Sequence, residues 1–177
     1  HDALPIFGVP PNLYIIGTMN TADRSVEALD TALRRRFSFI EMNPEPAKLS
    51  TEEFKCKGID LEALLNAINN RIEKLLDKDY CIGHSYFMTV KNRQSPLEEI
   101  KTIFQNKILP LLQEYFYGDW GKILLVIGKE FVATKENTIK FLSTDSYEDF
   151  EEYDEKPIYN FTNPSSWTID SFKSIYE

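Results

Sequence analysis

The spacing of apolar residues predicts a short α/β segment at the start of the chain. Residues 13–19 form a largely apolar run that the polar Asn20 follows, as in a strand buried on both faces of a parallel sheet. Residues 37–42 alternate apolar and polar positions and predict a second strand, which two nearby prolines end. A short helix, reaching about Leu33, is expected between them. Residues 1–46 therefore predict strand, helix, strand, which is half of an α/β unit.

Further along the chain the apolar residues recur with a helical period. Asp60 is the expected N-cap of a helix with seven apolar residues on one face. A second helix is predicted from about residue 96 to 117, and Pro110 in its interior should kink or divide it. Gly118 marks a turn. The apolar run at 120–127 fits either a helix or a strand.

Beyond Gly128 the spacing of apolar residues is less regular. Residues 131–133 and 139–142 predict a hairpin, and residues 158–161 predict a late strand. The sequence thus favours an α+β chain in three parts. An α/β fragment is followed by a mostly helical part at 47–128, and then by an extension at 129–177 with a β element and an acidic loop.

Composition excludes several classes of protein. With 42% apolar and 27% charged residues, the 177-residue chain can bury a core and is neither disordered nor fibrous. No apolar run is long enough to cross a bilayer and no leader is recognisable, so we expect a cytoplasmic protein without a membrane partner. Cys56 and Cys81 are too few for a disulfide framework and lack neighbours at metal spacing, so no metal site is predicted. Because His1 stands where Met is expected, we interpret the chain as part of a longer protein.

Charge is distributed unevenly along the chain. The net charge of -8 disfavours a general nucleic-acid-binding surface. Three consecutive arginines at 34–36 nevertheless form a local cluster of positive charge, whereas residues 145–155 are rich in Asp and Glu. The acidic stretch is typical of a solvated loop.

The candidate functional residues lie next to the two predicted strands. Asn20 follows the first strand, and the carboxyl edge of an open α/β sheet is where ligands bind. Its carboxamide can both donate to and accept from a water that faces a terminal phosphate. The arginines stand at the end of the following helix, and guanidinium groups bind phosphate oxygens in a forked geometry. This combination is typical of phosphoryl transfer.

The amino-acid sequence of these segments resembles the second half of a AAA+ core. Within that superfamily it resembles the McrB family. Residues 17–25 read Gly-Thr-Met-Asn-Thr-Ala-Asp-Arg-Ser, and residues 33–37 read Leu-Arg-Arg-Arg-Phe. Residues 82–87 and 109–116 are similar to the lid of the same family. The resemblance covers residues 9 to about 128 and is most specific in 12–37.

The resemblance implies roles for individual residues. Asn20 matches the sensor 1 residue, and Arg35 and Arg36 match an arginine finger that acts on the nucleotide of the next subunit. Asp23 and Arg24 complete a signature loop that senses a partner. Two further residues are candidate assistants in this site, namely Arg34, which could instead pair with Asp30, and His84.

The resemblance also implies cofactors and partners. These are GTP or ATP with Mg²⁺, self-association into a ring that we expect to be a hexamer, a nuclease subunit resembling McrC, and DNA bound through a separate N-terminal domain. Such a motor serves restriction systems that recognise 5-methylcytosine. No Gly-x4-Gly-Lys-Ser/Thr loop occurs in the chain, and no apolar run ends in Asp-Glu. We therefore expect this chain alone to be inactive.

Several simpler interpretations remain open. Asn20 could cap the following helix, the arginines could be a solvated patch or could contact nucleic acid, and His84 could be structural. At the level of the whole protein, one alternative is a MoxR-like AAA+ ATPase that remodels proteins. Another is a non-catalytic scaffold module that binds a nuclease partner or DNA.

Overall fold

The computed structural model describes residues 8–19, 35–56, 58–135 and 156–177. The chain forms two compact units, His1–Phe39 and Ile40–Glu177. The division falls earlier than residue 46, where the sequence pattern placed it. Within the described ranges, every helix and strand belongs to the second unit.

The first unit and the residues that follow it do not contain the two strands predicted at 13–19 and 37–42. Residues 13–19 and 37–42 are irregular and exposed, and Ile16 is 95% exposed. One turn is closed where the Leu13 N–H donates to the Pro10 carbonyl at 3.2 Å. A strand needs a neighbour to pair its backbone groups, and the described part of this unit holds none. The helix expected between the two segments lies outside the described residues.

The amphipathic pattern after Asp60 forms helix α2 (Leu61–Leu75), as predicted. The Asp60 carboxylate accepts the Ala63 N–H at 2.9 Å and caps the helix. The apolar face of α2 is buried at Leu64, Ile68 and Ile72. This face is the centre of the core of the second unit.

The second predicted helix forms in three stretches. These are α3 (Pro96–Ile103), a π-helical turn η6 (Phe104–Ile108) and α4 (Leu109–Tyr115). Pro110 has no N–H, and its ring would clash with the carbonyl four residues before it. The helix accommodates this proline by widening, and the Leu109 N–H donates to the Phe104 carbonyl. Pro110 therefore interrupts the helix with a π turn rather than ending it.

The ambiguous apolar run is helix α5 (Trp120–Ile127), capped by Asp119, whose side chain accepts the Lys122 N–H. Helix α5 packs against α2 and α4. The remaining helices of the described ranges are short. They are the 3-10 helices η2 (Pro46–Leu49), η3 (Glu52–Phe54), η4 (Lys78–Tyr80), η5 (His84–Val90) and η7 (Pro164–Ser166), and helix α7 (Ile169–Lys173).

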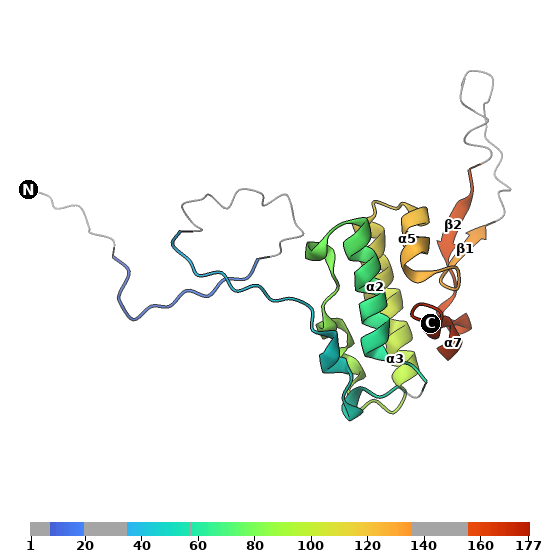
Figure 1. Ribbon diagram of the computed structural model, residues 1–177, viewed down its shortest axis with the longest axis horizontal. Helices are drawn as coiled ribbons and strands as arrows, with labels where there is room; N and C mark the ends of the chain where they lie inside the picture. The colour runs from blue at the N-terminus through green and yellow to red at the C-terminus, as the bar shows by residue number, and fades with distance from the viewer. Residues whose placement is uncertain (1–7, 20–34, 57, 136–155) are drawn as a thin grey trace, which may run out of the picture. The chain divides into compact units, whose positions relative to one another are not determined.

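Strands β1 (Val132–Lys135) and β2 (Ile158–Phe161) pair antiparallel, with Val132 opposite Phe161. Figure 1 shows the pair lying next to α5 and α7. The late strand is thus confirmed, but it is the partner of the strand that follows α5. Residues 139–142, which the sequence suggested as that partner, lie outside the described residues.

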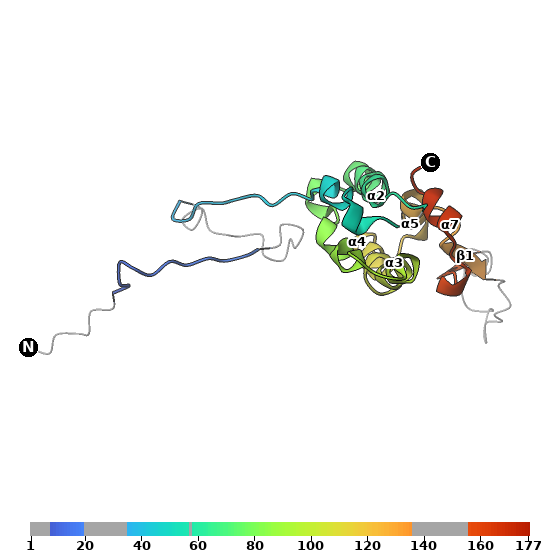
Figure 2. The same ribbon diagram turned by 90° about the horizontal axis from the view of Figure 1, so that it is seen from below.

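A cluster of aromatic rings joins the end of the chain to the helices. Phe131 packs against Phe104, Trp167 and Phe172, with ring centroids 5.3–5.4 Å apart. Figure 2 shows α7 and β1 on the same side of the unit. Because Phe104 lies in the π turn, the C-terminal residues share one core with the helical part.

Candidate functional site

Two of the predicted arginines are described, and both are available to an external ligand. Arg35 and Arg36 lie in an exposed turn of the first unit. Within the described part of the chain, neither guanidinium forms a hydrogen bond or an ion pair. Two adjacent, solvated cations without an acidic partner are suited to an incoming anion such as a phosphate.

The other predicted residues of this region cannot be placed. Asn20, Asp23, Arg24 and Arg34 lie outside the described residues. Their roles as sensor, signature loop and assistant therefore stay predictions.

The segment that follows the arginines contacts the helical residues of the second unit through two polar contacts. The first is an ion pair on the surface, in which Lys78 Nζ lies 2.8 Å from Glu41 Oε1. Its hydrogen bond to Glu41 raises the pKa of the Lys78 ammonium. Because both side chains are exposed to solvent, which screens their attraction, this pair adds little to stability.

The second contact involves His84, the histidine predicted as an assisting residue. The backbone N–H of Glu45 donates to His84 Nδ1 at 3.1 Å. Only an unprotonated nitrogen can accept, so the neutral ring carries its proton on Nε2. Within the described residues, Nε2 has no partner. The Glu45 carboxylate accepts from Lys48 Nζ at 2.8 Å, and this hydrogen bond to a cation lowers the pKa of that carboxyl.

A buried amide pair holds the backbone just before His84. The Ile82 N–H donates to Asn69 Oδ1 at 2.7 Å, and Asn69 Nδ2 donates to the Ile82 carbonyl at 2.9 Å. Asn69 was not singled out from the sequence. The available signal was a polar residue on the apolar face of α2, between Leu65 and Ile72.

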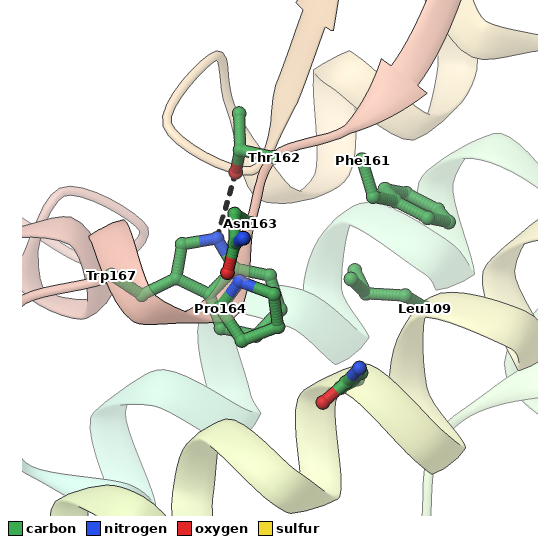
Figure 3. A pocket seen from close by; sticks show the side chains of 7 residues that line it. Leu109, Phe161, Thr162, Asn163, Pro164 and Trp167 are labelled. Atoms are coloured by element: carbon green, nitrogen blue, oxygen red, sulfur yellow. Dashed lines mark hydrogen bonds between the residues drawn. The ribbon is translucent and has the colours of Figure 1, made fainter.

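The C-terminal segment leaves a hollow against the π turn (Figure 3). The indole N–H of Trp167 donates to Thr162 Oγ1 at 2.7 Å, and this hydroxyl donates to the Glu130 carbonyl at 2.8 Å. These polar groups therefore have partners within the protein. The hollow is lined by Gln105, Leu109, Phe161, Thr162, Asn163, Pro164 and Trp167.

The described residues contain no group of three metal-ligating side chains. Cys56 and Cys81 are free thiols, and burial raises the pKa of both. None of the described helices combines the length and the hydropathy that crossing a bilayer requires.

Comparison with known proteins places the lid in a family. Residues 60–124 match the family described as McrB, alpha-helical lid domain. This range begins at the cap of α2 and ends within α5.

Two relatives are components of restriction enzymes. The chain is 42% identical over 128 residues to the type IV methyl-directed restriction enzyme EcoKMcrB subunit of Escherichia coli (strain K12), covering 64% of this chain and 27% of that protein. It is 32% identical over 114 residues to the type II restriction enzyme BsuMI component YdiS of Bacillus subtilis (strain 168), covering 60% of this chain and 32% of that protein. The chain thus spans less than a third of the length of each relative. The chain is McrB-like, and its residues 60–124 match the alpha-helical lid domain of that family.

Proposed function

We propose that this chain is part of a McrB-like AAA+ NTPase of a DNA restriction system, and that Arg35 and Arg36 act as an arginine finger. The observation that carries the proposal is the exposed Arg35–Arg36 turn, which has no ion-pair partner among the described residues and is joined by a short segment to a McrB-type lid. In this proposal the arginines contact a nucleotide held by a neighbouring subunit of a ring, which we expect to be a hexamer. Each subunit then completes the site of the next.

The chemistry of the pair suits this role. A guanidinium group stays charged at all working pH values and binds two phosphate oxygens at once. During phosphoryl transfer negative charge spreads over the transferred group, and an arginine finger can raise the rate by about a thousandfold or more. The nucleotide is GTP or ATP with Mg²⁺, and the ion neutralises phosphate charge when bound. Since the described residues offer no metal-holding group, we place the magnesium ligands in other parts of the protein.

The residues that the structure does not describe complete the proposal. Asn20 is the sensor 1 residue that orients the attacking water, and Arg34 assists the finger. Asp23 and Arg24 form the loop that senses a nuclease partner resembling McrC. DNA is bound by a separate domain.

The exposed apolar residues of the first segments support a larger α/β core. Ile15, Ile16 and Ile40 lie more than half exposed, although such side chains are normally buried. We propose that residues 13–19 and 37–42 become strands when the rest of the sheet pairs with them. The names of both relatives favour a restriction function over protein remodelling.

The test uses Arg36→Ala in the full-length protein. We expect turnover to fall about a thousandfold while nucleotide affinity changes little, because the finger acts on charge that develops during transfer. Arg93, an exposed arginine of the lid, provides the matched control, and Arg93→Ala should keep normal turnover. Unchanged turnover in the double variant Arg35→Ala/Arg36→Ala would reject the finger.

A mixing experiment tests action on the neighbouring subunit. Arg36→Ala and Asn20→Ala subunits are each expected to be nearly inactive. In a mixed ring, an Arg36→Ala subunit still has its sensor, and an Asn20→Ala neighbour supplies the arginine. Turnover should therefore reappear on mixing. Failure of two folded, co-assembled variants to complement would place both residues in one site.

A further inference from the structure

The contact between His84 and Glu45 lies where the chain leaves the core of the lid. On the C-terminal side of Glu45, helix η2 packs on α2 and Leu49 is buried. On its N-terminal side, residues 41–43 are exposed, and Glu41 forms a surface ion pair with Lys78. The Glu45 N–H is thus bonded at the border between the anchored and the exposed parts of the segment.

The sequence around Glu45 allows this bond in one register only. Pro44 and Pro46 have no N–H, so Glu45 carries the single backbone donor among these three residues. A residue that precedes proline is also kept out of the helical region, and Glu45, with φ -122° and ψ 75°, lies outside that region. The segment therefore cannot slip by one residue and keep the bond.

His84 itself is held in place by the rest of the lid. Asn69 pairs with both backbone groups of Ile82, two residues earlier. On the other side, Phe87 and Val90 of η5 are buried in the core. The backbone on both sides of His84 is therefore anchored independently of the hydrogen bond from the Glu45 N–H to His84 Nδ1.

The position of this anchor limits where the arginines can reach. Glu45 lies nine positions after Arg36, so at most about 32 Å of extended chain joins them. If the bond at Glu45 were lost, the next firmly buried residue would be Leu49, and the possible reach would grow by up to about 14 Å. Displacing a catalytic group by about 1 Å can lower the rate a hundredfold. The additional reach of the arginine-bearing segment is therefore large enough to affect the rate.

We propose that His84 is a positioning residue for the arginine pair, because its Nδ1 fixes the point at which the arginine-bearing segment leaves the lid. The inference rests on the proposed function of Arg35 and Arg36. It gives His84 a role through the backbone of Glu45 and not through contact with nucleotide.

Three substitutions of His84 in the full-length protein test this role. In His84→Asn the side-chain oxygen can take the place of Nδ1, in His84→Gln the amide reaches the place of Nε2, and His84→Ala has neither group. Hydrogen exchange of the Glu45 amide reports the bond, and steady-state kinetics report its consequence. Lys78→Gln, which removes the exposed ion pair to Glu41, is the control.

We expect the Glu45 amide to exchange about five to ten times faster in His84→Ala and His84→Gln, and at the normal rate in His84→Asn. The kcat should fall about tenfold in the first two variants, with KM nearly unchanged, and should recover in His84→Asn. The control should keep both values.

Three results would overturn the proposal. One is normal exchange of the Glu45 amide in His84→Ala. Another is faster exchange without a change in kcat. The third is restored exchange in His84→Asn without restored kcat, which would assign a direct role to Nε2. Failure of the arginine finger itself is separate, because Arg36→Ala would then keep normal turnover whatever the exchange at Glu45 shows.

Discussion

Asn69 and Ile82 are joined through both of their amide groups, with the Ile82 N–H donating at 2.7 Å and its carbonyl accepting at 2.9 Å. Both residues are buried. Asn69 thereby gives the backbone of Ile82 the partners that a neighbouring strand would otherwise provide. The pair also connects α2 to the residues that lead into His84.

Replacing Asn69 should therefore destabilise the lid strongly. In Asn69→Ala the N–H and the carbonyl of Ile82 lose their partners inside the core, and we expect a loss of about 2–3 kcal/mol in the free energy of unfolding. Urea denaturation of the purified chain measures this value. Asn70→Ala, at the exposed neighbouring position, should change it by less than about 0.5 kcal/mol. Equal effects of the two substitutions would mean that the paired amides add nothing.

Tyr117 is held in a backbone conformation that suits glycine better. Its φ is 51°, and its side chain is 97% exposed. The left-handed region costs a residue with a Cβ about 1–2 kcal/mol, and glycine avoids this cost. Glycine also increases the entropy of the unfolded chain, which cancels part of the gain in stability. We expect Tyr117→Gly to stabilise the chain by about 0.5–1 kcal/mol in urea denaturation. Tyr117→Ala keeps the Cβ and should be nearly neutral, whereas a destabilised Tyr117→Gly would show that the ring makes a contact of its own.

Tyr115 should make the lid sensitive to alkaline pH. Burial raises the pKa of its hydroxyl to about 12, and the ring lies edge-on to Tyr80 with centroids 5.1 Å apart. An unfolded tyrosine ionises near pH 10, so above that pH the unfolded state releases a proton that the folded state retains. The stability that the neutral hydroxyl contributes is therefore complete below about pH 10 and is lost as pH rises towards 12.

Urea denaturation at pH 9 and pH 11 can detect this loss. The wild-type chain should lose more stability between these two values than Tyr115→Phe, which has no hydroxyl to ionise. Identical pH dependence of the two chains would mean that Tyr115 ionises as easily in the folded state as in the unfolded one.

The parts of the fold that depend on local sequence were predictable, and the parts that depend on distant partners were not. Helix α2 follows from the apolar period after Asp60, and the interrupted helix follows from Pro110. The strand after α5 pairs with Ile158–Phe161, and nothing in its own residues identifies that partner. Residues 13–19 have the composition of a buried strand, but the described part of their unit provides no strand to pair with them.

The candidate site shows the same limit. The wording around Arg35 and Arg36 identified them as arginines of interest, and their exposure is consistent with binding an anion. The sequence did not predict the partner of His84, because that partner is a backbone N–H. Any residue except proline carries this donor, so the residue type at position 45 does not predict the hydrogen bond to His84.

Arg71 joins two helices through a carbonyl group rather than a carboxylate. Its Nη1 donates to the Val126 carbonyl at 2.8 Å, in the last turn of α5, where helix carbonyls lack a partner and carry partial negative charge. Arg71→Met keeps most of the aliphatic stem but removes the donor, so we expect the free energy of unfolding to fall by about 1.5–3 kcal/mol.

The salt dependence of this loss separates a hydrogen bond to a helix end from an ordinary surface charge effect. The donor is half-buried and touches its acceptor, and within the described residues it has no carboxylate partner. Such a contact is screened far less than exposed ion pairs, which salt weakens. The difference between wild type and Arg71→Met should therefore be nearly the same in 0.1 M and 1 M NaCl. A difference that vanishes in 1 M NaCl would assign the effect of Arg71 to long-range charge and not to its bond with Val126.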